Sequence, residues 1–383
     1  MDKPGTAKAT SGSRHNSRSR RSATTLVWVA SIVAIACSDG ATSPSLHHPP
    51  PPGSIQVLEL TTYDGSGQAV HPDAVIIPAG WGGLSASNLV VTPYPGGQAS
   101  FENPSVFIGQ SAIGWEWEIP QGVQNPIARP TSGGYLSDPD ELYNPSTNEL
   151  WLYYRQVTSQ NEILLTRSSD GVHWGAPITV VSVPNHEAIS PTVVRMSEQD
   201  WRLWTVNSGV NGCSAPSTTV ELRTSTDGIH WASPQTVSLG DQGDFPWHLD
   251  VTWVPEQNQF WALYNAKVSG SCTTGVLRFA VSQDGIHWTT TPTPLLSRGV
   301  IPEFADIVYR ASLQYNAASD AVTIWYSGAR YSQSSYEWHI AVQQMSRATM
   351  LVKVTQTPLA IGPELDNVPG TLAPPPLTNA TAP

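Results

Sequence analysis

Three short stretches of this sequence each place two titratable side chains two residues apart. They read His71-Pro-Asp73, Asp138-Pro-Asp140 and His248-Leu-Asp250. The aspartate that ends each stretch lies five residues before a proline, so the three stretches can be superposed. Side chains two residues apart project from the same face of a strand. We therefore expect the six groups to converge, in a pattern that suits general acid and base catalysis.

The other candidate site residues do not share this regular spacing. The same alignment, continued along the chain, adds His186, Glu187 and Arg310. Glu102 and Glu303 lie outside the alignment and are alternative carboxylates for the same chemistry. Trp247 directly precedes His248 and is a candidate to stack on a sugar ring.

A repeat predicts the elements that position these residues. The chain contains SSDGVHW, STDGIHW and SQDGIHW, whose aspartates at 170, 227 and 284 recur every 57 residues. Each copy follows a stretch of alternating apolar and polar residues, as in a strand. We interpret Asp-Gly as a hairpin turn and His-Trp as the start of the next strand, with both rings packing between sheets. The aspartates are assigned a structural role as turn residues.

This period is typical of propeller blades. Extended in both directions, it predicts five units of about four strands, starting near Val70, Asp138, His186, Trp247 and Glu303. The predicted fold is all-β, a five-bladed β-propeller whose first strands line a central channel. Two β-sandwiches are the alternative, which an even 57-residue step across the middle of the chain disfavours.

Composition agrees with an all-β chain outside the cytoplasm. Pro 33, Gly 30 and Trp 15 are high, and only 13% of residues are charged. The formal charge of −11 becomes −16 if residues 1–36 are removed, because they contain six basic residues and one acid. A nucleic-acid partner is therefore not expected. We expect a monomer.

The N-terminus predicts export. Basic residues precede an apolar stretch from Thr25 to Ala36, which is too short to span a bilayer. Ala34-Ile35-Ala36-Cys37 resembles a bacterial lipobox, which implies cleavage before Cys37 and a lipid anchor on it. The domains expected are a signal peptide at 1–36, a Ser/Pro-rich tether at 37–54, the propeller at 55–350 and a partly disordered extension at 351–383. Cys213 and Cys272 lie about one period apart, and an exported chain permits a disulfide between them.

Five blades, Asp-Gly-x-His-Trp turns and acidic residues that open the first two blades resemble the five-bladed glycoside hydrolases of families 43 and 32. The resemblance covers roughly residues 70–345. It implies a base or nucleophile in blade one, an orienting aspartate in blade two and an acid in blade three, which correspond by blade order to Asp73, Asp138 and Glu187. Asp140 shares the role of Asp138. Such an enzyme cleaves a glycosidic bond of a carbohydrate substrate, and we expect inversion, with carboxyl groups about 6.5–9.5 Å apart.

Two other readings remain open. One is a non-catalytic propeller that binds glycan or metal, and the other is a structural propeller of the cell envelope. The enzyme is expected to need no cofactor, although a structural calcium in the channel is allowed and His71 with His248 could hold zinc or calcium. An enzyme needs an acid and a base facing one site, whereas a binding protein does not.

Overall fold

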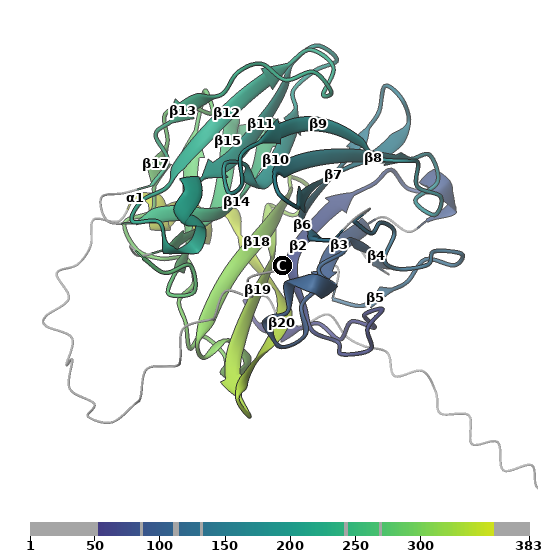
Figure 1. Ribbon diagram of the computed structural model, residues 1–383. Helices are drawn as coiled ribbons and strands as arrows, with labels where there is room; N and C mark the ends of the chain where they lie inside the picture. The colour runs from purple at the N-terminus through teal and green to yellow at the C-terminus, as the bar shows by residue number, and fades with distance from the viewer. Residues whose placement is uncertain are drawn as a thin grey trace, which may run out of the picture. The chain divides into compact units, whose positions relative to one another are not determined.

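The computed structural model describes residues 53–355 except 85–86, 110–114, 131–132, 241–243 and 268–269, with side chains described up to residue 351. Within these residues, twenty strands form five antiparallel sheets of four strands each. The inner strands of the five sheets, β2, β6, β10, β14 and β18, lie around a common centre (Figure 1). The predicted five-bladed β-propeller is confirmed.

Each blade is a meander that runs outward from the channel. Blade 1 contains β2 (Ala69–Ile76), β3 (Ser87–Pro93), β4 (Ser105–Gly109) and β5 (Trp117–Glu118). Blade 2 contains β6 (Tyr135–Asn144), β7 (Glu149–Val157), β8 (Asn161–Ser168) and β9 (Ile178–Val183). Blade 3 contains β10 (Ile189–Arg195), β11 (Trp201–Asn207), β12 (Thr219–Ser225) and β13 (Gln235–Val237). Blade 4 contains β14 (Phe245–Val254), β15 (Gln259–Lys267), β16 (Val276–Ser282) and β17 (Thr289–Thr290).

The fifth blade is completed by the N-terminal end of the propeller. Its strands β18 (Ile307–Asn316), β19 (Ala321–Ser332) and β20 (Ser335–Ser346) are followed on the outside by β1 (Ile55–Val57). β1 pairs antiparallel with β20, with Ile55 opposite Gln343. The two ends of the propeller are thus joined in one sheet. The 57-residue repeat did not predict this closure, because β1 lies before the first repeated unit.

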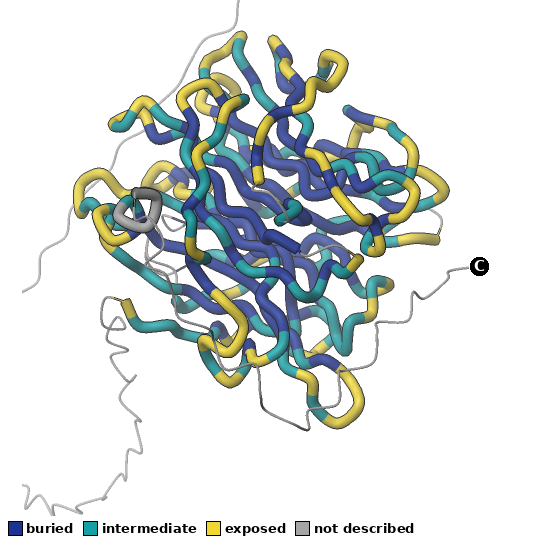
Figure 2. Tube along the Cα trace, turned by 90° about the vertical axis from the view of Figure 1, so that its left-hand side faces the viewer, coloured by how far each residue is buried: buried dark blue, intermediate teal, exposed yellow. Residues whose placement is uncertain are grey.

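Helical segments are short and lie between or after the strands. Helix α1 covers Arg347–Thr355, and the 3-10 turns are η1 (Trp81–Gly83), η2 (Pro95–Gly97), η3 (Ala99–Phe101), η4 (Gly209–Ser214), η5 (Pro255–Gln257) and η6 (Pro302–Phe304). Among the described residues, the longest of these helices falls well short of the apolar length that a membrane crossing requires. Buried residues concentrate in the strands and exposed ones in the connecting loops (Figure 2).

Five hydrogen bonds connect the inner strands in a closed ring. Asp73 accepts the backbone N–H of Glu141 in blade 2, and Asp140 accepts that of Val193 in blade 3. The same contact recurs from Val251 to Thr192, from Leu313 to Asp250 and from Ala74 to Ser312. Every blade thus holds the next at one equivalent position, and the fifth holds the first.

The repeated Asp-Gly turns form a second set of contacts. Asp227 Oδ1 accepts the N–H groups of Ile229 and His230, and the same bonds recur at Asp170 and Asp284. The structural role predicted for these aspartates is confirmed. Trp204 of blade 3 donates its Nε1–H to the carbonyl of Gly285 in blade 4, and Tyr153 donates to Gly228 in the same way. The turns therefore fasten neighbouring blades.

Two details of the predicted turn were wrong. The strands after the motif begin at Ile178, Gln235 and Thr289, so His-Trp belongs to the turn and does not open a strand. The histidine side chains are 80–86% exposed and contact the turn aspartate through Nδ1, so they do not pack between blades. The tryptophans do pack against the core clusters.

We predict that Gly285→Ala destabilises the fold. Gly285 has φ 76°, and a Cβ there would lie 2.7 Å from Trp204 Cζ2. Left-handed backbone strain and overpacking together should lower the free energy of unfolding by about 2–4 kcal/mol. Gly299→Ala is the control, because its φ is 78° and nothing lies within 4 Å of the added Cβ. Denaturant unfolding of both variants checks this, and equal losses would show that the contact with Trp204 is not limiting.

Candidate functional site

The inner strands each carry a register shift near the channel. It lies between Val70 and Asp73 in β2, between Ser137 and Asp140 in β6 and between Ile189 and Thr192 in β10. At these shifts His71, Asp138 and Ser190 have φ of 52–55° and precede a proline. A bulge residue ordinarily adopts a right-handed helical conformation, which a following proline disfavours. The equivalent His248 and Arg310 precede Leu249 and Ala311 and are not among the residues with positive φ.

The shifts produce two layers of side chains in the channel. The upper layer contains His71, Asp138, Ser190, His248 and Arg310, all buried. The lower layer, two residues further along each strand, contains the acceptors of the closed hydrogen-bond ring. All six residues of the three superposed sequence stretches lie in these two layers. The expectation that they converge is met, but they divide into two groups with different partners.

The upper layer brings three ligand atoms together. His71 Nε2 lies 3.5 Å from Asp138 Oδ1, and His248 Nδ1 lies 3.1 Å from the same oxygen. One nitrogen or oxygen atom from each residue falls within 4.8 Å of the other two. None of these three buried atoms has a hydrogen-bond partner among the described residues. Two imidazoles and one carboxylate that converge in this way are suitable ligands for a divalent cation such as Zn²⁺. Arg310 Nη1 also lies 3.7 Å from Asp138 Oδ1.

Neighbouring side chains orient these groups. His71 Nδ1 lies 3.0 Å from Thr92 Oγ1 and 3.6 Å from Glu102 Oε2, so a proton on Nδ1 leaves Nε2 free to face the cluster. On the other side, Arg155 Nη1 and Ser137 Oγ donate to Asp138 Oδ2, which directs Oδ1 toward the histidines. Neither Thr92 nor Arg155 was predicted from the sequence. One signal was present in the sequence: Arg155 directly follows the five apolar residues Leu150–Tyr154, and a charged residue in a buried strand needs a partner.

Burial and charge change the acidity of this layer. Burial lowers the pKa of His71 and of His248, while the Asp138 carboxylate opposes that shift. Burial would raise the pKa of Asp138, but His71, His248 and Arg155 hold it well below its usual value. Burial and the charge of Asp138 raise the pKa of Glu102 well above its usual value.

The lower layer has a different environment. The carboxylates of Asp73, Asp140 and Asp250 lie close enough to share one ion, but each already accepts a backbone N–H from the next blade. Burial raises the pKa of all three, and for Asp140 and Asp250 the charge of Asp73 adds to the effect; the pKa of Asp250 rises to about 7. Arg310 partly offsets these shifts. The calcium allowed for the channel stays a prediction.

Aromatic rings enclose the histidines. Tyr309 contacts His248 edge-on, with ring centroids 4.4 Å apart, and also lies near His71. Trp247 donates its Nε1–H to the Tyr309 hydroxyl and is only 7% exposed. The structure thus places Trp247 behind Tyr309, as a support for the wall of the site.

Six predicted site residues lie outside both ligand clusters. Glu102, Arg310 and Trp247 still contact the upper one. The other three do not belong to either layer. Glu187 and His186 are partly exposed before β10, and Glu303 is partly exposed in η6. Glu187 is near Arg223, on the blade 3 side. The sequence-based pairing of Asp73 with Glu187 is therefore not supported by a shared cluster among the described residues.

Cys213 and Cys272 form a disulfide in the structure, with sulfur atoms 2.07 Å apart. It joins the η4 loop of blade 3 to the β15–β16 loop of blade 4. Lys267 Nζ donates to the carbonyls of Cys213 and Ala215 and lies 5.1 Å from the centroid of the Trp247 ring. The cross-linked loops therefore contact the same wall of the channel through Lys267.

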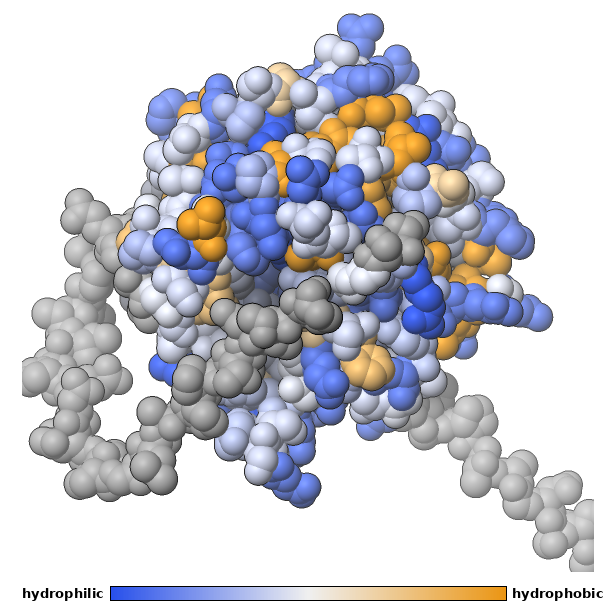
Figure 3. All heavy atoms as spheres, viewed as in Figure 1, coloured by the Kyte–Doolittle hydropathy of each residue, from blue (hydrophilic) through white to orange (hydrophobic). Residues whose placement is uncertain are grey.

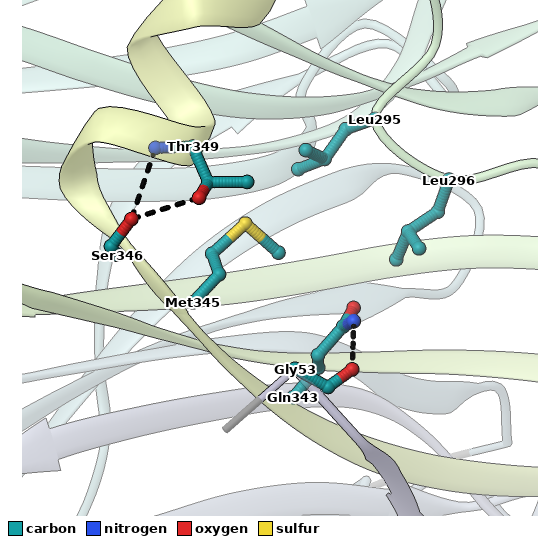
Figure 4. A pocket seen from close by; sticks show the side chains of 7 residues that line it. All are labelled: Gly53, Leu295, Leu296, Gln343, Met345, Ser346 and Thr349. Atoms are coloured by element: carbon teal, nitrogen blue, oxygen red, sulfur yellow. Dashed lines mark hydrogen bonds between the residues drawn. The ribbon is translucent and has the colours of Figure 1, made fainter.

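A separate groove of about 490 Å³ lies between α1, β20 and the loop after β17. Figure 4 shows Leu295, Leu296 and Met345 along it, beside hydrogen-bonded Ser346 and Thr349. Its described lining contains no titratable side chain, so we do not assign it chemistry. On the face drawn in Figure 3, polar atoms cover most of the surface and apolar atoms form separate patches.

The comparisons with known proteins find one curated relative with a related sequence. This chain is 31% identical over 310 residues to an A type blood N-acetyl-α-D-galactosamine deacetylase of Flavonifractor plautii. The match covers 68% of this chain and 40% of the relative, so the chain spans less than half the length of the protein it matches. No family model matches the chain.

Solved structures show the same fold. An N-acetylgalactosamine deacetylase from F. plautii, solved in complex with blood group B trisaccharide, superposes with a TM-score of 0.71 at 26% identity, over 78% of this chain and 96% of that one. A thermostable family-43 glycoside hydrolase gives 0.54 at 12% identity, over 72% and 88% of the two chains. An α-L-arabinanase of Penicillium chrysogenum gives 0.51 at 13%, over 76% and 98%. The two hydrolases establish fold similarity alone.

We predict that the upper layer binds one divalent cation. Protein dialysed against Zn²⁺ should retain about one ion per chain, because three unpaired ligand atoms converge. His248→Ala should retain at least about 10-fold less, while His230→Ala, which changes an exposed turn histidine, should bind as the wild type does. Metal analysis after gel filtration measures this. Equal Zn²⁺ content in His248→Ala and wild type would exclude His248 as a ligand.

Proposed function

We propose that this protein is a metal-dependent hydrolase that removes the acetyl group from an N-acetylated amino sugar of a glycan. The observation that carries the proposal is the convergence of His71 Nε2, Asp138 Oδ1 and His248 Nδ1 in a buried channel. The similarity to an N-acetylgalactosamine deacetylase supports the substrate class.

Each residue of the site has a separate role in this proposal. His71, Asp138 and His248 would hold the cation, which when bound supplies Lewis-acid activation of the amide carbonyl. Hydrolysis breaks the C–N bond, places the hydroxyl of water on the acyl carbon and gives a proton to the amine nitrogen. Glu102 is the candidate for proton transfer, because besides Asp138 it is the described carboxylate within 4 Å of the His71 ring. Tyr309 of blade 5 and Trp247 of blade 4 pack beside His248 and would hold its ring in place.

Amide hydrolysis suits this site better than glycosidic hydrolysis. Inverting or retaining cleavage needs two carboxylates on opposite sides of one sugar. Here Asp73, Asp140 and Asp250 are engaged by backbone N–H groups, and Asp138 is held by Arg155 between two histidines. The glycoside hydrolase predicted from the sequence is therefore the less favoured activity of this carbohydrate-directed site.

We predict acetate release from an oligosaccharide that ends in N-acetylgalactosamine. His248→Ala should lower kcat/KM at least about 100-fold, because loss of a ligand would weaken binding of the cation that activates the amide carbonyl. Glu102→Gln should lower kcat by about 100-fold with little change in KM, as expected for a proton-transfer group. Enzymatic acetate determination, with the free amine measured in parallel, gives both values.

A control variant and metal removal test this proposal further. His230→Ala should keep wild-type activity, and a chelator should abolish acetate release until Zn²⁺ is restored. Release of reducing sugar without acetate would replace the proposal with glycoside hydrolysis. Glycan binding with neither product would favour the non-catalytic propeller.

We also propose that the protein is exported and anchored to a bacterial membrane through lipid on Cys37, which lies outside the described residues. The apolar stretch from Thr25 to Ala36, which ends directly before Cys37, supports this. Expressed in full in a bacterial host, the wild type should be found in the membrane fraction and incorporate labelled palmitate. Cys37→Ser should lose the label, whereas Cys213→Ser should keep it. Equal labelling of Cys37→Ser would refute the anchor.

A further inference from the structure

The carboxylate of Asp138 is the group that the charged side chains around it share, because His71, His248, Arg155 and Arg310 all lie within 4 Å of its oxygens. Its side chain is fully buried, and its backbone adopts φ 52° at the register shift of β6. An aspartate in this left-handed conformation stores backbone strain, which persists only where the surroundings impose it.

A chain of hydrogen bonds connects Asp138 to the neighbouring blade. Arg155 Nη1 lies 3.3 Å from Asp138 Oδ2, and Arg155 Nε donates to Asn161 Oδ1 at 2.8 Å. Asn161 Nδ2 in turn donates to the carbonyl of Ala188, just before β10, at 3.0 Å. All four residues are buried. The guanidinium is thus held from blade 3 while it holds a carboxylate of blade 2.

This arrangement divides the two oxygens of Asp138. Oδ2 is engaged by Arg155 and Ser137, whereas Oδ1 has no hydrogen-bond partner among the described residues and faces His71 and His248. A carboxylate with one engaged oxygen presents a single ligand atom in a fixed direction. Partners that orient a ligand in this way typically alter metal affinity by about 10–100-fold.

We propose that Arg155 and Asn161 are positioning residues that make Asp138 a one-oxygen metal ligand. The inference rests on the proposed function, because it requires the upper layer to bind a cation. Lysine cannot replace Arg155, since its single ammonium cannot reach Asn161 and Asp138 with the fixed fork of a guanidinium. Neither residue was predicted from the sequence.

Co²⁺ alone is the probe, because its visible absorption reports coordination as well as affinity. Titrated into wild-type protein, it should give a saturable band. Arg155→Lys should weaken binding about 10–100-fold and change the band, because Asp138 is no longer held. Asn161→Ala should change both in the same direction by a smaller factor, since the guanidinium is still present but has lost the partner that orients its Nε.

Arg223→Lys is the matched control. Arg223 is a similarly buried arginine on β12, with partners Thr205 and Glu221 that lie outside the upper layer. It should bind Co²⁺ as the wild type does. Thermal unfolding of the metal-free variants separates loss of the site from loss of the fold, and Asn161→Ala decides the test if Arg155→Lys does not fold.

Two failures are distinguishable. Wild-type affinity and an unchanged band in folded Arg155→Lys or Asn161→Ala would overturn the positioning role and leave the metal site intact. Absence of Co²⁺ binding by the wild type would overturn the metal-dependent function itself, and this inference with it.

Discussion

Five backbone N–H groups around the channel, one on the inner strand of each blade, are held by a side-chain oxygen of the preceding blade. Each buried bond contributes only about 1 kcal/mol net. Their effect on geometry is larger, because together they fix the height of every inner strand relative to its neighbours. The upper layer lies two residues from these bonds, so its side chains inherit the same register. A shift of one residue in any blade would turn its upper-layer residue away from the channel.

The two layers explain why similar residues have different roles. Asp138 and Asp140 are separated by one proline, yet Asp140 accepts a backbone N–H and Asp138 faces two histidines. In blade 1, Asp73 likewise accepts a backbone N–H, whereas His71 faces Asp138. A ring of oxygen acceptors needs only a short polar side chain, and Thr192 or Ser312 serves as well as aspartate. The proposed cation would restrict the upper layer more, because one atom from each of three residues would have to converge on it.

The sequence predicted the propeller architecture and most of the residues that line the channel, but not which role each of these residues has. Period and strand alternation are local properties, so five blades and the superposition of His71, Asp138 and His248 could be predicted. The closure by β1 could not, because it pairs residues almost 290 positions apart with no repeated motif. Glu187 was assigned by blade order, whereas the structure places it outside both clusters. Arg155, Thr92 and Asn161 lie on second and third strands, whose contacts with the channel depend on how blades pack.

The fold alone does not decide the chemistry of the channel, which depends on the residues of the upper layer. A propeller channel lined by carboxylates is compatible with glycosidic cleavage, and proteins with this fold include a family-43 glycoside hydrolase. In this chain two of the five upper-layer positions are histidines and one is an arginine, so nitrogen atoms surround a single carboxylate. For this reason we propose a cation beside an amide carbonyl, with Glu102 beside His71 as the second carboxylate of the site.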